Sequence, residues 1–132
     1  MKITLIRHGR TIGNVKGCFN GVTNDPLCDD GVETIKEYVE KGIYPEVGIV
    51  VSSPLKRCLQ TSNLIYPQHK PIVVDNLREI NFGDFENKTH LQLENNPDYI
   101  RWIKSNGTSD IPNGESFKLS LIHISEPTRH AQ

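Results

Sequence analysis

The chain has 132 residues, of which 36% are hydrophobic and 23% charged, and its formal net charge is -1. This length predicts one domain that can bury a core. Because Lys and Arg are not in excess and form no basic run, the charge balance argues against nucleic acid or an anionic membrane as a partner. No segment has a membrane-spanning length, and Arg7 and His8 interrupt the first apolar run too early for a signal peptide, so we expect a cytoplasmic protein.

Short apolar runs alternate with segments of helical spacing along the first half of the chain. Residues 3–6, 47–51 and 71–74 are β-branched and nearly continuous, which is typical of strands covered on both faces. Residues 30–41 and 54–65 have the spacing of helices, and Pro54 suits a helix start. This alternation predicts an α/β fold with a parallel sheet. Farther along, residues 89–103 predict a helix broken at Asn96-Pro97, and residues 107–116 a loop.

Three cysteines make an odd count without CxxC spacing: Cys18, Cys28 and Cys58. The spacing predicts free thiols, with neither a disulfide nor a metal site.

Arg7 and His8 stand together at the C-terminal end of the first predicted strand, where open parallel sheets bind their ligands. We expect Gly9 to permit a sharp turn after them, and Thr11 and Asn14 add polar groups close by. An Arg beside a His at such a place can hold a phosphate while the imidazole attacks it. The segment therefore indicates phosphoryl transfer.

Residues 5–14 resemble the RHGxTxxN signature of the histidine phosphatase (phosphoglycerate mutase-like) superfamily. Four further segments agree in order and approximate spacing: the loop of residues 19–31, SSxLxRxxQT at 52–61, LxExxFGxxE at 77–86 and PxGES at 112–116. The resemblance covers about residues 3 to 118, which we interpret as the N-terminal portion of such a domain (residues 1–118). It implies an α/β three-layer sandwich with a mostly parallel central sheet, incomplete at the C-terminus.

The resemblance also implies catalytic roles. His8 would be the nucleophile that becomes phosphohistidine, and Arg7 and Arg57 would clamp the phosphoryl oxygens with planar, permanently charged donors. Glu79 would protonate the leaving oxygen and then activate water. The chemistry is positioning plus charge neutralisation, and the resemblance implies no cofactor and no metal.

Substrate binding would fall to the two arginines and to three further residues. Asn14 would donate a hydrogen bond to the phosphoryl group, and Asn20 and Gly21 would line the substrate side of the pocket. Each role has a plainer alternative, such as a cap by Asn14 or a solvated surface charge at Arg57. Within the motifs the functional interpretation is favoured for Arg7, His8, Arg57 and Glu79.

Several side chains take no part in this prediction. His69 and His90 match no motif and are expected at the surface, and Cys58 is expected to pack as a small residue. Arg10 and Asn87 depart from the superfamily pattern without touching the core chemistry.

The superfamily has a second catalytic histidine, in a VxHGG-like motif after the PxGES loop. Neither His123 nor His130 fits that context, so the second histidine is absent from this chain. Residues 119–132 resemble the translation of a sequencing-library adaptor and are expected to be a non-native tail. We therefore expect the chain as written to be weakly active or inactive, and poorly soluble.

The predicted function is hydrolysis of small phosphate monoesters through a phosphohistidine, with α-ribazole phosphate as a candidate and a small phosphorylated metabolite as the only partner. Two alternatives stay open. One is a cofactor-dependent phosphoglycerate mutase, which the short segment between Glu79 and Pro112 disfavours. The other is a non-catalytic phosphate-binding fragment. The sequence leaves the oligomeric state open.

Overall fold

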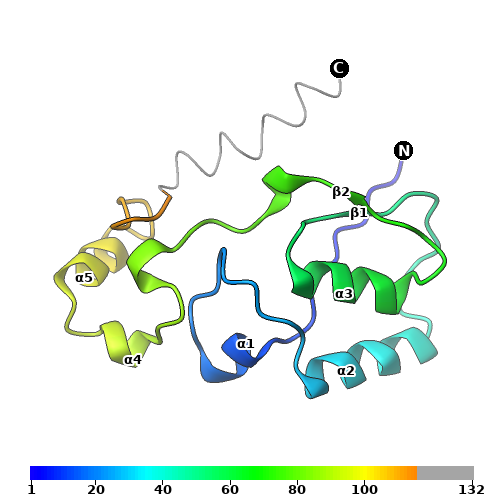
Figure 1. The fold of residues 1–132 in the computed structure, drawn as a ribbon, viewed down its shortest axis with the longest axis horizontal. Helices are drawn as coiled ribbons and strands as arrows, with labels where there is room; N and C mark the ends of the chain where they lie inside the picture. The colour runs from blue at the N-terminus through cyan, green and yellow to red at the C-terminus, as the bar shows by residue number, and fades with distance from the viewer. Residues whose placement is uncertain (116–132) are drawn as a thin grey trace.

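The computed structural model describes residues 1–115 (Figure 1). Its helices are α1 (Ile12–Lys16), α2 (Asp29–Glu40), α3 (Lys56–Ile65), α4 (His90–Leu93) and α5 (Pro97–Lys104). Its strands are β1 (Val51–Ser52) and β2 (Ile72–Val73), and the 3-10 turns η1 (Asp75–Leu77) and η2 (Gly83–Phe85) follow β2. The predicted tail, with His123 and His130, lies outside the described residues.

The sheet is parallel, as the alternating pattern predicts. β1 pairs with β2, Val51 lies opposite Ile72, and α3 forms the connection between the two strands. Both strands are shorter than predicted. The prediction of a strand at residues 3–6 is wrong within the described chain, because the segment finds no neighbouring strand there and makes no backbone pairing.

The helices agree with the sequence pattern more closely than the strands. α2 begins and ends one residue earlier than the predicted range of residues 30–41. α3 ends where predicted, at Ile65, but begins at Lys56, with Leu55 as its N-cap. The break expected at Asn96-Pro97 is present, because the Asn96 side chain accepts hydrogen bonds from the backbone N–H groups of Asp98 and Tyr99 and starts α5. The short helix α1 has no counterpart among the predicted elements. Residues 107–115 contain no helix or strand, as expected of a loop.

Two separate clusters of apolar side chains hold the structure together. The first lies between α2 and α3 and consists of Leu27, Ile35, Ile65 and Tyr66. The second is largely aromatic, lies around α4 and α5, and consists of Phe85, Leu93, Tyr99 and Ile111 with Phe19, Phe82 and Trp102 packed against it. Phe85 meets Tyr99 edge to face, with ring centroids 5.4 Å apart. Figure 1 shows α4 and α5 at one end of the molecule and the sheet with α2 and α3 at the other.

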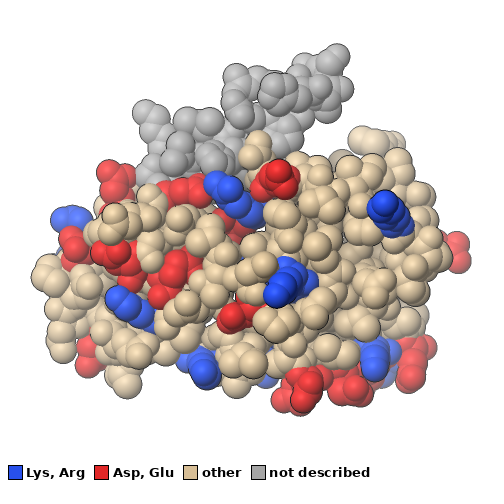
Figure 2. Space-filling model, viewed as in Figure 1, with Lys and Arg blue, Asp and Glu red and all other residues tan. Residues whose placement is uncertain are grey.

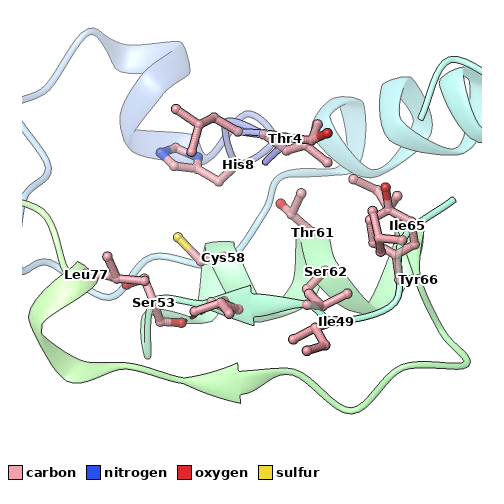
Figure 3. Close-up of a pocket in the computed structure, with 16 residues that line it drawn as sticks. Thr4, His8, Ile49, Ser53, Cys58, Thr61, Ser62, Ile65, Tyr66 and Leu77 are labelled. Carbon is pink, nitrogen blue, oxygen red and sulfur yellow. Dashed lines mark hydrogen bonds between the residues drawn. The ribbon is translucent and has the colours of Figure 1, made fainter. Parts of the chain in front are cut away.

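Apolar side chains are exposed around the N-terminal segment and the sheet. Leu5 is 92% exposed, Ile49 71% and Ile72 55%. A cavity of about 310 Å³ separates residues 4–6 from residues 47 and 49–53, and its wall is mainly apolar (Figure 3). These segments therefore leave backbone edge and apolar surface without protein cover in the described part of the chain. In the same part, none of the helices combines the length and apolar character that crossing a membrane requires.

We predict that the 132-residue chain, expressed alone, is poorly soluble because of this surface. Replacing Leu5 and Ile49 together with Ser should raise the soluble fraction, measured by centrifugation and size-exclusion chromatography. The matched change at a buried position, Ile35→Ala, should lower it, since truncating a buried aliphatic side chain costs about 2–5 kcal/mol. A soluble monomer of the unaltered chain with a cooperative thermal transition would contradict the prediction.

Candidate active site

His8 follows the extended N-terminal segment and is half-buried. Its Nδ1 lies 2.7 Å from the carbonyl oxygen of Gly9. Because a carbonyl oxygen only accepts hydrogen bonds, Nδ1 carries the proton, and the neutral ring keeps its lone pair on Nε2. The hydrogen bond therefore selects the tautomer whose Nε2 can act as a nucleophile.

The surroundings of His8 favour its neutral form. Burial lowers the pKa of the imidazole below its usual 6.5, and the charges of Arg57 and Arg7 lower it further. The hydrogen bond to Gly9 and the carboxylate of Glu79 act in the opposite direction. The imidazole is thus mostly unprotonated at pH 7. The charges of Arg7, Arg57 and Glu79 thus lie within electrostatic range of His8.

Arg57 is a buried side chain, 1% exposed, which excludes the alternative of a solvated surface charge. Its Nη1 donates to the carbonyl oxygen of Thr23 (2.6 Å), and its Nη2 donates to those of Gly21 (2.7 Å) and Asn20 (3.2 Å). Its Nε–H and one Nη1–H make no hydrogen bond within residues 1–115. Arg57 therefore fixes a loop and still holds two donors that a phosphoryl group could use.

Arg7 and Glu79 are both exposed, and neither makes an ion pair or hydrogen bond to another described residue. The neighbouring Arg78 does not pair with Glu79, because it pairs with Glu115 at 3.4 Å. Figure 2 shows Lys and Arg scattered among acidic side chains on the face drawn. Positive charge at the site is therefore supplied by individual arginines.

Asn14 has the capping role that was its plainer alternative. Its Oδ1 accepts from the Thr11 N–H (3.0 Å), and the Thr11 hydroxyl accepts from the Asn14 N–H (3.1 Å). This capping box starts α1 and leaves the Asn14 amide N–H groups without a partner among residues 1–115. Asn20 donates from its Nδ2 to Asp25 (3.0 Å). Gly21 is buried in the loop that Arg57 holds.

Gly9 has no positive φ. Its lack of a side chain permits close packing, since a Cβ there would lie 2.6 Å from the Ile35 side chain. Cys58 lines the 310 Å³ cavity and faces His8 across it, and burial raises the pKa of its thiol (Figure 3). Arg7, Arg57 and Glu79 do not line this cavity, so we do not assign it to the substrate.

Three residues with structural roles at the site have no role in the sequence prediction. Glu86 accepts hydrogen bonds from the loop that contains Gly21. Thr61 accepts from the Gly9 N–H (2.9 Å), and Gln60 accepts from the Leu27 N–H (2.8 Å). All three are specified positions of the motifs given above, Gln60 and Thr61 in SSxLxRxxQT and Glu86 in LxExxFGxxE. Their place in these motifs could have indicated a role at the site. Within the described chain, no three His, Cys, Asp or Glu side chains gather as metal ligands.

The fold and the site define a histidine phosphatase domain. A family profile described as "Histidine phosphatase superfamily (branch 1)" matches residues 3–121, and the chain belongs to this superfamily.

Among curated proteins, the chain is similar to an adenosylcobalamin/alpha-ribazole phosphatase of Salmonella typhimurium, with 30% identity over 125 residues. It is also similar to the "Probable phosphoglycerate mutase GpmB" of Proteus mirabilis, with 30% identity over 120 residues. These alignments cover 89% and 88% of this chain, and 60% and 56% of the relatives. The chain therefore spans about 60% of the length of the curated relatives it matches.

Among solved structures, the alpha-ribazole phosphatase from Shigella flexneri matches with a TM-score of 0.81 and 28% identity, over 96% of this chain and 64% of that one. The protein TTHB049 from Thermus thermophilus matches with a TM-score of 0.78 and 27% identity, over 94% of this chain and 69% of that one. The predicted superfamily and α/β fold are confirmed.

We predict opposite shifts of the His8 pKa when its charged neighbours are neutralised. Arg7→Gln should raise the pKa because it removes a cation, and Glu79→Gln should lower it because it removes an anion. The measurement is an NMR titration of the His8 imidazole. Lys36→Gln, a change at an exposed lysine on α2, is the control and should leave the pKa unaltered. Shifts of the same sign in both variants would contradict the arrangement.

Proposed function

We propose that the complete protein is a phosphatase that hydrolyses small phosphate monoesters through a phosphohistidine at His8. The observation that carries this proposal is the state of His8: its Nδ1 proton is held by Gly9, its pKa is lowered, and arginine charge lies nearby. This state keeps Nε2 free for attack on phosphorus. The superfamily membership supports the same reaction.

In the first step, Nε2 of His8 attacks the phosphorus and the bond to the ester oxygen breaks. Glu79, protonated at this stage, gives its proton to the departing oxygen, so the alcohol leaves neutral. Arg7 and the uncommitted donors of Arg57 neutralise charge on the phosphoryl oxygens, and Asn14 adds its amide N–H. The products are phosphohistidine, the alcohol and an ionised Glu79.

In the second step, the Glu79 carboxylate takes a proton from water, and the oxygen of that water attacks the phosphohistidine. The N–P bond breaks, inorganic phosphate leaves, and His8 and protonated Glu79 are restored. Asn20 and Gly21 line the alcohol side of the pocket in this proposal. A second histidine belongs to the superfamily pattern, and losing one preorganised donor costs on the order of 10²–10³ in rate, so we propose that the 132-residue chain alone is weakly active.

We predict that brief incubation of the complete protein with a ³²P-labelled monoester leaves acid-labile, base-stable label on His8. His8→Ala should carry no label and have no measurable turnover, because no other group replaces the nucleophile. Glu79→Gln should turn over about 10²–10⁴-fold more slowly, since proton transfer is lost. His69→Ala is the matched control, and it should behave as the unaltered protein. Full activity of His8→Ala would exclude the mechanism.

A substrate panel separates the phosphatase from the alternative mutase, which the similarity to GpmB supports. We predict that α-ribazole 5′-phosphate and other small monoesters release inorganic phosphate. With 3-phosphoglycerate and catalytic 2,3-bisphosphoglycerate, we expect hydrolysis without formation of 2-phosphoglycerate. The two outcomes are read by phosphate release and by NMR of the glycerate products, and dominant isomerisation would establish the mutase.

A further inference from the structure

The loop of residues 20–23 is held from both sides by opposite charges. The peptide group between Asn20 and Gly21 accepts from Arg57 through its carbonyl oxygen (3.2 Å) and donates to Glu86 through its N–H (3.0 and 3.2 Å). The next peptide group repeats the arrangement, with the Gly21 carbonyl oxygen on Arg57 (2.7 Å) and the Val22 N–H on Glu86 (3.0 Å). Two consecutive peptide dipoles thus connect the guanidinium and the carboxylate.

Glu86 also reaches beyond this loop. Its Oε2 accepts from the Thr23 hydroxyl (2.5 Å), and its Oε1 accepts from the N–H of Phe82 (3.0 Å). Phe82 lies three residues after Glu79, on the segment that carries the proposed general acid. A single carboxylate therefore connects the substrate-side loop to the general-acid segment. Successive backbone N–H groups that point to one anion form a known type of anion-binding site. Here the anion is the Glu86 carboxylate.

Gly21 is the residue that allows these two segments to touch. A Cβ at position 21 would lie 1.7 Å from the carbonyl oxygen of Ile80 and 2.7 Å from Oε1 of Glu86. Neither position can yield easily, because one is backbone and the other is fixed by its hydrogen bonds. The absence of a side chain at Gly21 thus sets the distance between the loop and the segment after Glu79.

We propose that Glu86 is a positioning residue that fixes the 20–23 loop and the Glu79 segment together on the leaving-group side of the site. It touches neither the phosphoryl group nor His8, and it acts through Gly21, Val22 and Phe82. This assignment rests on the proposed phosphatase function. The proposal predicts an effect that depends on the leaving group. An alkoxide is a poor leaving group and needs the proton of Glu79, whereas p-nitrophenolate is a stable anion that leaves without it.

The test compares two substrates on the same sample of the complete protein. Glu86→Gln should lower kcat/KM for an alkyl monoester by on the order of 10²-fold, since a small misplacement of a catalytic group has that effect. The rate with p-nitrophenyl phosphate should fall far less. The ratio of the two rates does not depend on how much of the sample is folded, so a merely structural loss would leave it unaltered. An unaltered ratio overturns the proposal.

A second readout does not depend on activity. Hydrogen exchange of the Gly21, Val22 and Phe82 amides should accelerate in Glu86→Gln, while that of Val32 in α2, whose N–H is bonded to Cys28, should not. If the unaltered protein has no phosphatase activity, the proposed function fails and this exchange still decides whether Glu86 holds the segments. Unchanged exchange at all three amides overturns the role of Glu86.

Two further variants complete the design. Glu94→Gln changes an exposed carboxylate at the end of α4 and should alter neither the rate ratio nor the exchange. Thr23→Val removes one hydrogen bond of Glu86 and should produce a smaller change of both readouts in the same direction. If Glu86→Gln does not fold, Thr23→Val decides, and an effect no larger than that of Glu94→Gln counts against the proposal.

Discussion

The buried guanidinium of Arg57 is the interaction on which the site depends. A cation taken out of water is costly unless most of its donors are satisfied, and here carbonyl oxygens of the 20–23 loop accept three hydrogen bonds from the guanidinium. The loop cannot move away without leaving that charge unpaired. Other residues of α3 extend the same attachment, because Thr61 holds Gly9 and the Lys56 N–H donates to the Asn24 side chain. One helix thus aligns the segment of His8 with the loop beside it.

This organisation suits phosphoryl transfer, in which catalysis is mainly the positioning of charge. His8, the proposed nucleophile, is held in one tautomer by the backbone, through the hydrogen bond from its Nδ1 to the Gly9 carbonyl oxygen. The burial and the nearby cations that lower its pKa are consequences of the same packing. Arg7 and Glu79, by contrast, are exposed and have no partner among residues 1–115, which leaves their charges available to a substrate. The hydrogen-bonded residues thus hold His8 in place, and the ester would lie beside the exposed Arg7 and Glu79.

The two halves of the fold differ in how far they are completed by residues 1–115. The aromatic cluster around Phe85 and Tyr99 is closed and supports the segment from Phe82 to Glu86. The sheet is not closed: residues 3–6 pair with no strand, and the cavity beside them has an apolar wall. The chain spans about 60% of the length of its curated relatives. The contacts that hold the site come from α3 and from Glu86. They do not depend on further strands beside β1 and β2.

The sequence by itself determined the superfamily and helices α2 to α5, and it predicted the charged residues around His8. These features are local: a motif is read from adjacent letters, and helical spacing and caps such as Asn96 act within a few residues. The strands were predicted less well, because pairing needs a partner that spacing cannot provide, and residues 3–6 have none within the described chain. Only the tertiary structure decided that Arg57 is buried against the Gly21 carbonyl oxygen and that Glu86 meets the Gly21 N–H. Those last contacts join residues 36 and 65 positions apart, and no local pattern specifies which peptide group a distant charge will face.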